Sequence, residues 1–306
     1  MNHLLIDGYN LAFRSHFAFN TLMTSRGLMS GCFYGFLTSL KTVKNKYPQC
    51  HVTIAWDTES TRRKSIDASY KAERPKFSAS AQIQDLKGIF SFLNVSQAEY
   101  PGEEADDVIA SLVRKYSEPD NQILIYSSDK DLLQLVKDGK VLAIHPKKGA
   151  KPEKIFDEAA VKEEHGVWPK DFECYQCFRG DAIDGVPGVP RIKTACLIPL
   201  IEKYKTPQEV YAHLQEEKLT EFQRESLKAF EQRVYLNKSL VGLRNDLELD
   251  VKNGRPDEEW VSKYLVKYEI RAINPNSYIN VYFDAPSFNI RKAPAIKSFS
   301  LFEEAE

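Results

Sequence analysis

The sequence lacks several features that would place the protein outside the cell interior. It contains no apolar run of the roughly 18 to 20 residues that a membrane span requires. Its opening, MNHLLIDGYN, has neither the basic start nor the long apolar core of a signal peptide. Cysteine is scarce, with five residues scattered along 306. We therefore expect reduced thiols, no membrane association and a cytoplasmic location.

Excess charge of either sign and several common catalytic motifs are also missing. The 42 basic and 43 acidic residues give a net charge of −1, so no global attraction to nucleic acid is expected, although a local basic surface can still form. No G-x-S-x-G elbow, Walker loop or G-x-G-x-x-G loop is present, which argues against an esterase, an NTPase or a dinucleotide enzyme. The single C-x-x-C pair, Cys174 and Cys177, indicates one helix face rather than a zinc site.

Three apolar segments that end in aspartate are the first positive signal. HLLID, HVTIAWD and QILIYSSD end at Asp7, Asp57 and Asp129. Helical apolar spacing follows each of them, over 31–46, 80–93 and 130–137. This alternation predicts an α/β fold with a central, mainly parallel sheet flanked by helices. Because ligands bind beyond the carboxyl ends of such strands, we expect the three aspartates to meet at one edge.

Four carboxylates crowd the segment GEEADDVIAS, at positions 103, 104, 106 and 107. They could simply cap a helix at the surface, where its dipole favours anions. If this helix packs beside the third strand, its first turn instead joins the aspartates at the sheet edge. The predicted cluster is then Asp7, Asp57, Glu104, Asp106, Asp107, Asp129 and Asp131.

Crowded acids of this kind require cations, because like charges repel and burial removes water. Ligands that are all oxygen favour Mg²⁺, with Mn²⁺ as a substitute, over zinc. Two such ions about 4 Å apart would suit in-line displacement at phosphorus, with no nucleophilic side chain.

A basic segment, TRRKSIDASYKAERPK, follows Asp57 directly. It is either a solvated stretch or, as we favour, part of a basic arch over about 58–84 that contacts phosphates without reading sequence. Its predicted nucleic-acid contacts are Arg62, Arg63, Lys64, Tyr70, Lys71 and Arg74. Lys71 and Arg74, three residues apart, would share a helical face and act as catalytic groups at the scissile phosphate. Tyr70 either stacks on a base or packs.

Taken in order, these motifs resemble the 5′ nuclease (flap endonuclease) family. The family includes the 5′→3′ exonuclease domain of bacterial DNA polymerase I and bacteriophage nucleases that remove RNA primers. The resemblance covers residues 1–200 and rests on LLIDGYNLAFR, SYKAERPKF, PGEEADDVIASL, SSDKDLLQL and FRGDAIDGVPGV.

The resemblance implies a PIN-like nuclease core over 1–176, a helical DNA-binding region over 177–284 with a helix-hairpin-helix element, and a C-terminal tail over 285–306. It implies two Mg²⁺ sites, the first lined by Asp7, Asp57, Glu104, Asp106 and Asp129. Asp131, Asp181 and Asp184 would line the second, with Asp107 between or beside them. Arg14 and Lys193 would contact phosphate.

One segment departs from the family pattern. GVPRIKTA is two residues shorter than the family's glycine-rich hairpin, and Pro190 and Arg191 stand where glycines are expected. Pro190 has no N–H to donate, and the conformational freedom of the glycines is lost. The hairpin's duplex contact and monovalent-ion site are therefore not implied for this chain.

The implied function is cleavage of DNA 5′ ends or flaps, or of RNA–DNA hybrids, in primer removal or repair. A PIN-type ribonuclease acting on RNA and a non-catalytic DNA-binding protein are the alternatives, although every expected acid is present. SFSLF, at 298–302, resembles peptides that dock on a sliding clamp, or it packs on the protein itself. A clamp or a single-strand-binding protein would be its partner. With no polymerase region in the sequence, we expect a free-standing, monomeric, phage-type enzyme in the host cytoplasm.

Overall fold

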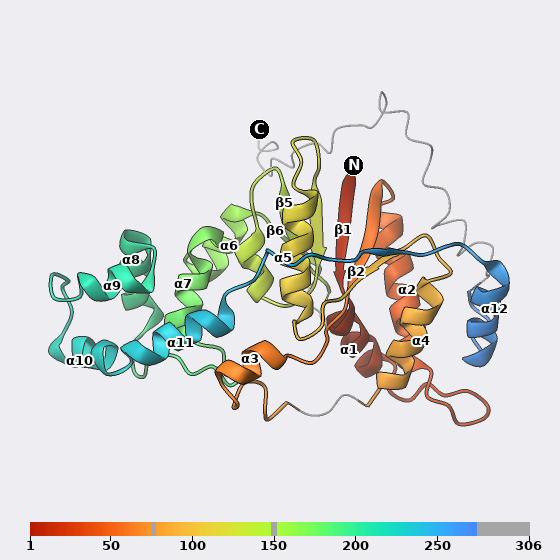
Figure 1. Cartoon of the computed structure of the whole chain (residues 1–306), viewed down its shortest axis with the longest axis horizontal. Coiled ribbons are helices and arrows are strands. Elements are labelled where there is room, and N and C mark those ends of the chain that lie inside the picture. The colour runs from red at the N-terminus through yellow and green to blue at the C-terminus, as the bar shows by residue number, and fades with distance from the viewer. Residues whose placement is uncertain (75–77, 148–151, 274–306) are drawn as a thin grey trace, which may run out of the picture.

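The computed structural model describes residues 1–74, 78–147 and 152–273, and its centre is a seven-stranded sheet (Figure 1). The strand order is β6-β5-β4-β1-β2-β3-β7. The five inner strands run parallel and are β1 (Asn2–Asp7), β2 (Cys50–Ala55), β3 (Ser96–Ala98), β4 (Ile123–Tyr126) and β5 (Val141–His145). The edge strands β6 (Lys154–Phe156) and β7 (Lys252–Asn253) pair antiparallel. The predicted mainly parallel sheet is confirmed.

Helices cover both faces of the sheet, because successive residues of a buried strand point to opposite sides. Leu4 and Ile6 of β1 pack in the same core as α1 (Gly8–Ala18), α2 (Gly31–Lys46) and α4 (Ser80–Phe90). Leu5 faces the other way and packs with α5 (Ala105–Tyr116). Figure 1 shows α5 in front of the strands and α2 and α4 beside them.

The helices predicted after the three strands are found, except for the last. The helix over 31–46 is confirmed as α2, and the one predicted over 80–93 ends at Phe90 as α4. The segment 130–137 forms a short 3₁₀ helix, η1 (Asp131–Leu135), instead of an α-helix. The carboxylate of Asp129 accepts the Asp131 N–H at 2.9 Å, and Val136 is already extended, so no room remains for further turns.

A second group of helices lies to the left of the sheet in Figure 1. It comprises α6 (Glu158–His165), α7 (Pro169–Arg179), α8 (Thr194–Tyr204), α9 (Pro207–Ala212), α10 (Glu221–Ala229) and α11 (Glu231–Val241). Phe172, Phe178, Leu197 and Val234 are among the buried residues of its core. The short helix α3 (Thr61–Ile66) lies between this group and the sheet (Figure 1). Cys174 and Cys177 are free and buried on α7, as predicted.

The chain then returns to the sheet, which corrects one domain expectation. The segment after α11 crosses in front of the sheet (Figure 1), β7 pairs with β3, and α12 (Glu258–Lys267) joins the core beside α4. Part of the predicted helical region 177–284 therefore packs on the nuclease core, because Val261 and Leu265 are buried there. The other predicted boundaries stay predictions.

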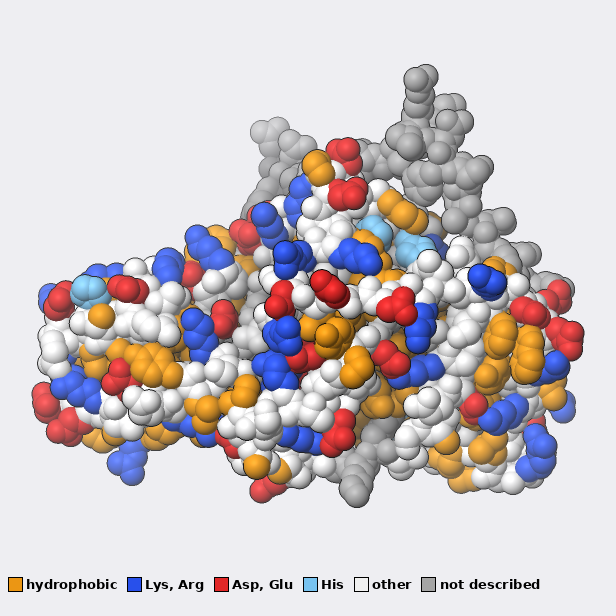
Figure 2. Space-filling model, in the orientation of Figure 1, with side chains coloured by type: hydrophobic (Ala, Val, Ile, Leu, Met, Phe, Trp, Pro, Cys, Tyr) orange, Lys and Arg blue, Asp and Glu red, His pale blue; other side chains and the backbone are white. Residues whose placement is uncertain are grey.

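The surface agrees with the near-neutral composition. Lysine and arginine side chains alternate with acidic ones over the face seen in Figure 2. Within the described ranges, no helix has both the length and the hydropathy that crossing a bilayer requires. The predicted tail over 285–306, with its SFSLF segment, lies outside the described residues.

Candidate active site

The structure brings the three strand-end aspartates to one edge of the sheet, because β1 lies between β4 and β2. Asp7 is the last residue of β1 and also caps α1, accepting the Asn10 N–H at 2.9 Å and the Ser127 hydroxyl at 2.9 Å. Asp57 follows β2 and accepts the Ala105 N–H at 2.9 Å. This last hydrogen bond holds the start of α5 against the end of β2.

The start of α5 adds two of the predicted acids to this edge. Glu104 is the N-cap residue of α5 and is 2% exposed, and Asp106 lies in the first turn. Burial raises the pKa of Asp106 well above its usual value, and the charges of Asp129 and Asp7 raise it further. Asp106 is thus close enough to both strand ends for their charges to act on it.

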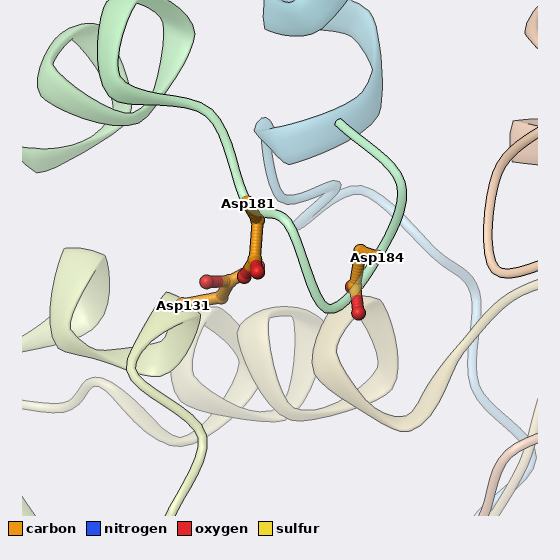
Figure 3. A group of neighbouring side chains, drawn as sticks. All are labelled: Asp131, Asp181 and Asp184. Carbon is orange, nitrogen blue, oxygen red and sulfur yellow. The ribbon is translucent and has the colours of Figure 1, made fainter. Parts of the chain in front are cut away.

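Three further acids gather beside η1 and the turn after α7. Carboxylate oxygens of Asp131, Asp181 and Asp184 lie within 4.8 Å of one another (Figure 3). In the described ranges this is the one group of three acids that approaches so closely. Asp181 and Val186 exchange two backbone hydrogen bonds, of 2.7 and 2.8 Å, which close the turn. Gly180 precedes it at φ +68°, and a Cβ there would lie 2.3 Å from the Gly188 nitrogen, so this position requires glycine.

The electrostatics fit a site for hard cations. Burial and the neighbouring Asp57 raise the pKa of Asp7 to about 7. Burial also raises the pKa of Asp57, Asp129 and Asp131. These acids are therefore insufficiently compensated by the protein alone. An all-oxygen ligand set with uncompensated charge suits Mg²⁺ or Mn²⁺.

Two cations of the predicted arch lie within the acidic group. The Lys71 ammonium is 2.8 Å from Glu104 and 3.6 Å from Asp184, and Arg74 pairs with Asp184. Burial alone would raise the pKa of Glu104, but Lys71 and Arg63 lower it to about 2.

The predicted helical face shared by Lys71 and Arg74 is wrong, since Lys71 lies in a turn with φ +54° and Arg74 lies in a bend. The Lys71 N–H donates to the Asp184 carbonyl at 2.9 Å, so the segment is docked on the 181–186 turn. The two side chains nevertheless reach the same carboxylate, that of Asp184.

The structure corrects the expected roles of Asp107 and Arg63. Asp107 is fully buried, and both of its oxygens accept from the Arg63 guanidinium. Arg63, 2% exposed, also donates to the Leu240 carbonyl at 2.8 Å. Because Arg63 binds both of its oxygens, Asp107 neutralises a buried arginine instead of lining a metal site. Arg63 is correspondingly shielded from any nucleic acid.

Two other predicted nucleic-acid contacts are also turned inward. Arg62 donates to the buried carboxylate of Glu103 at 2.7 Å and keeps a quarter of its side chain exposed. Tyr70 is 4% exposed, and its hydroxyl lies 3.1 Å from Glu104 and 3.3 Å from Asp184. Of the two interpretations of Tyr70, the structure therefore has it packed, because a buried ring cannot stack on a base.

The remaining predicted contacts lie on the surface. Arg14 donates to the Lys147 carbonyl at 2.6 Å, and Lys64 lies 3.5 Å from Glu59. Lys193 is exposed as the N-cap residue of α8. Two residues earlier, Arg191 has φ +58°, a left-handed conformation where the family has glycine. The departure noted in the sequence thus occurs at a strained backbone position.

Sequence reasoning missed several residues of the site. Lys130 lies 3.0 Å from Asp181, and its place between two predicted ligands was an available signal. Arg244 pairs with Glu103 at 2.7 Å and donates its N–H to Asp107 at 2.8 Å. Gln176 donates from α7 to Asp131. These last partners come from distant segments and carry no local motif.

Comparison with known proteins places this geometry in a family. A family model described as 5′-3′ exonuclease, N-terminal resolvase-like domain, matches residues 2–166. One described as 5′-3′ exonuclease, C-terminal SAM fold, matches residues 167–258. The chain is 34% identical over 277 residues to a 5′-3′ exonuclease of Aquifex aeolicus, which covers 88% of this chain and 92% of that protein.

Two further proteins show the range of the similarity. The chain is 32% identical over 283 residues to DNA polymerase I of Caldicellulosiruptor bescii, spanning 89% of this chain but 33% of the polymerase. A bacteriophage T5 flap endonuclease, solved with DNA and metal ions, shares the fold with a TM-score of 0.66 at 16% identity, over 92% of this chain and 98% of that one. With both family models matched in order and the Aquifex relative matched over most of its length, this chain belongs to the 5′-3′ exonuclease family.

Proposed function

We propose that this family member hydrolyses phosphodiester bonds with two Mg²⁺ ions, for which Mn²⁺ can substitute. Asp7, Asp57, Glu104, Asp106 and Asp129 would hold the first ion, and Asp131, Asp181 and Asp184 the second. The observation that carries the proposal is the convergence of acids from three strand ends, α5 and the 181–186 turn, with the pKa values of several raised.

The chain's own residues have distinct tasks in this proposal. When bound, the ions would supply Lewis acidity at the scissile phosphate. In the structure, Lys71 and Arg74 neutralise Glu104 and Asp184. Bound ions would take over this role and free the two basic side chains. The freed side chains would donate to phosphate oxygens, where charge develops during cleavage. Lys130, beside Asp181, would be released in the same way.

We further propose DNA with 5′ ends or flaps, and RNA–DNA hybrids, as substrates. Lys64 and Lys193 are exposed, and Arg74 is partly so. Contacts from such side chains to phosphate set affinity and position without reading the base sequence. The polymerase and flap endonuclease relatives support a role in primer removal or repair.

The tail and the cellular location complete the proposal. We propose that the segment around 298–302 docks on a sliding clamp or a single-strand-binding protein and that the nuclease acts as a monomer. We place it in the cytoplasm. The five free cysteines suit a reducing compartment.

A substrate panel tests the proposal. Purified protein is incubated with a 5′-flap duplex, a blunt duplex, an RNA–DNA hybrid and structured RNA, with and without Mg²⁺. We expect Mg²⁺-dependent cleavage of the flap and the hybrid. Cleavage of structured RNA alone would favour a PIN-type ribonuclease, and DNA binding without any cleavage would favour a non-catalytic protein.

A further inference from the structure

A buried glutamine connects the helical region to the acidic trio. Gln176 lies on α7, is 1% exposed and donates its side-chain N–H to the Oδ1 atom of Asp131. The oxygen of its amide accepts from the Nε2 atom of Gln134 at 2.8 Å. The same Gln134 nitrogen donates to the Val241 carbonyl at the end of α11, at 3.0 Å. One chain of hydrogen bonds thus links α11, η1 and α7 to Asp131.

The last link of this chain fixes the orientation of both amides. A backbone carbonyl can only accept, so Gln134 must turn its NH₂ group toward Val241. That NH₂ group also faces Gln176, which must therefore present its oxygen to Gln134. The NH₂ group of Gln176 is left pointing at Asp131. The donor at Asp131 is consequently set by the fold and cannot flip without leaving a buried polar atom unsatisfied.

We propose that Gln176 is a positioning residue for Asp131 in the second metal site. Its hydrogen bond holds one oxygen of the carboxylate and leaves the other to face the ion. This inference rests on the proposed function, in which the trio of Asp131, Asp181 and Asp184 holds a divalent ion.

Gln176 differs from the cations that contact the acids. Lys71, Arg74 and Lys130 carry charges that compete with a metal ion for the carboxylates. The neutral amide of Gln176 orients Asp131 without competing, because it adds no positive charge to the site. Groups that orient metal ligands in this way commonly change metal affinity 10–100-fold when they are removed.

Calorimetric titration with Mn²⁺ alone, in the absence of DNA, tests the inference. In Gln176→Leu we expect the affinity of the second ion to fall about 10- to 100-fold while the first stays within about twofold. Gln134→Leu removes the hydrogen bonds to the Gln176 amide oxygen and the Val241 carbonyl but keeps the donor at Asp131, so it should weaken binding of the second ion by less. Gln82→Leu is the matched control, since Gln82 is also buried but accepts from the Phe33 N–H at 3.0 Å in the α2–α4 core.

The outcomes separate this inference from the proposed function. Asp131→Asn should lose the second ion, and if it binds two ions like the wild type, the metal assignment falls and this inference with it. If Asp131→Asn loses that ion while Gln176→Leu binds it normally, the inference alone is overturned. If Gln176→Leu does not fold, unchanged binding of both ions by Gln134→Leu overturns the inference.

Discussion

At the scale of residues, the acidic segment 103–107 divides into two pairs with opposite tasks. Glu104 and Asp106 lie with the acids at the sheet edge, where Glu104 pairs with Lys71. Glu103 and Asp107 pair with arginines alone, Glu103 with Arg244 and Asp107 with Arg63, which also reaches Glu104 at 3.2 Å. Arginines therefore compensate part of this crowded negative charge, Arg63 from a buried position and Arg244 from a partly exposed one.

The reassigned acid gives the first prediction. Asp107→Asn removes the carboxylate that binds two nitrogens of the buried Arg63 guanidinium and leaves only Glu104, at 3.2 Å, to balance its charge. Breaking a buried pair in this way costs about 3–5 kcal/mol. Urea unfolding should show a loss of that order, while Mn²⁺ affinity stays close to wild type. Asp120→Asn, on the surface, serves as the control. Weakened Mn²⁺ binding without lost stability would return Asp107 to the metal site.

Lys71 gives the second prediction, because its ammonium occupies the place where a cation is needed. Lys71→Met should bind Mn²⁺ more tightly than wild type in the absence of DNA. Its single-turnover cleavage rate should fall about 10²–10³-fold, the usual loss when one donor to developing charge is removed. Arg74→Ala should behave similarly, and Lys115→Met, exposed in the last turn of α5, is the control.

The balance between binding and rate decides how Lys71 acts. Duplex binding should weaken less than the rate in Lys71→Met. Equal losses in the two quantities would indicate simple electrostatic attraction. A large fall in melting temperature would indicate that Lys71 is structural.

At the scale of elements, the sequence predicted those features of the fold and the site that depend on residues close together in the chain. The parallel strands and their terminal aspartates followed from apolar runs and the rule for strand ends, and the acid trio followed from the family motif. The inward rotation of Arg63 could not be predicted, because its partner Leu240 lies 177 positions away. The 3₁₀ form of η1 likewise depends on how the Asp129 carboxylate meets the next turn.

The sheet edge gives the third prediction, on pH. The pKa of Asp7 is raised to about 7 in the fold from an unfolded value of about 3.9. The stability that its protonation supplies is full below about pH 4 and is lost as pH rises through about 7. Asp7→Asn, which stays neutral, should therefore gain stability relative to metal-free wild type between about pH 4 and 7.

Thermal melts in EDTA across this range measure the effect. The difference in melting temperature between Asp7→Asn and wild type should grow up to about pH 7 and then level. Added Mg²⁺ should reverse the difference at pH 8, because only wild type then has an ionised Asp7 carboxylate that can bind the ion. A difference that does not change with pH would mean that Asp7 is already ionised throughout.

At the scale of the whole molecule, the return of the chain to the sheet after α11 joins the helical region to the nuclease core. Arg63 contacts the end of α11, Arg244 contacts the start of α5, and β7 extends the sheet. The sequence indicated helices after residue 200 but not this return, because β7 has only two residues. The helical region is thereby fixed relative to the acidic edge, which a nuclease needs if it grips DNA in one place and cuts it in another.

The tail gives the fourth prediction, on residues outside the described part. Deleting 296–306 should leave cleavage of a short flap unchanged and remove any stimulation by a cognate sliding clamp. Cleavage assays with and without the clamp compare the full chain with the truncated one. A loss of basal activity or of melting temperature on deletion would show that the tail packs on the protein.

The central claim is that acids at the sheet edge hold the metal ions that cleave the phosphodiester. Its most direct test is single-turnover cleavage of a 5′-flap duplex by wild type and Asp129→Asn over a Mg²⁺ series, with DNA affinity measured in parallel. We predict Mg²⁺-dependent cleavage by wild type and none by Asp129→Asn, whose DNA affinity stays nearly intact because one repelling anion is gone. Cleavage by Asp129→Asn at the wild-type rate at saturating Mg²⁺ would contradict the account.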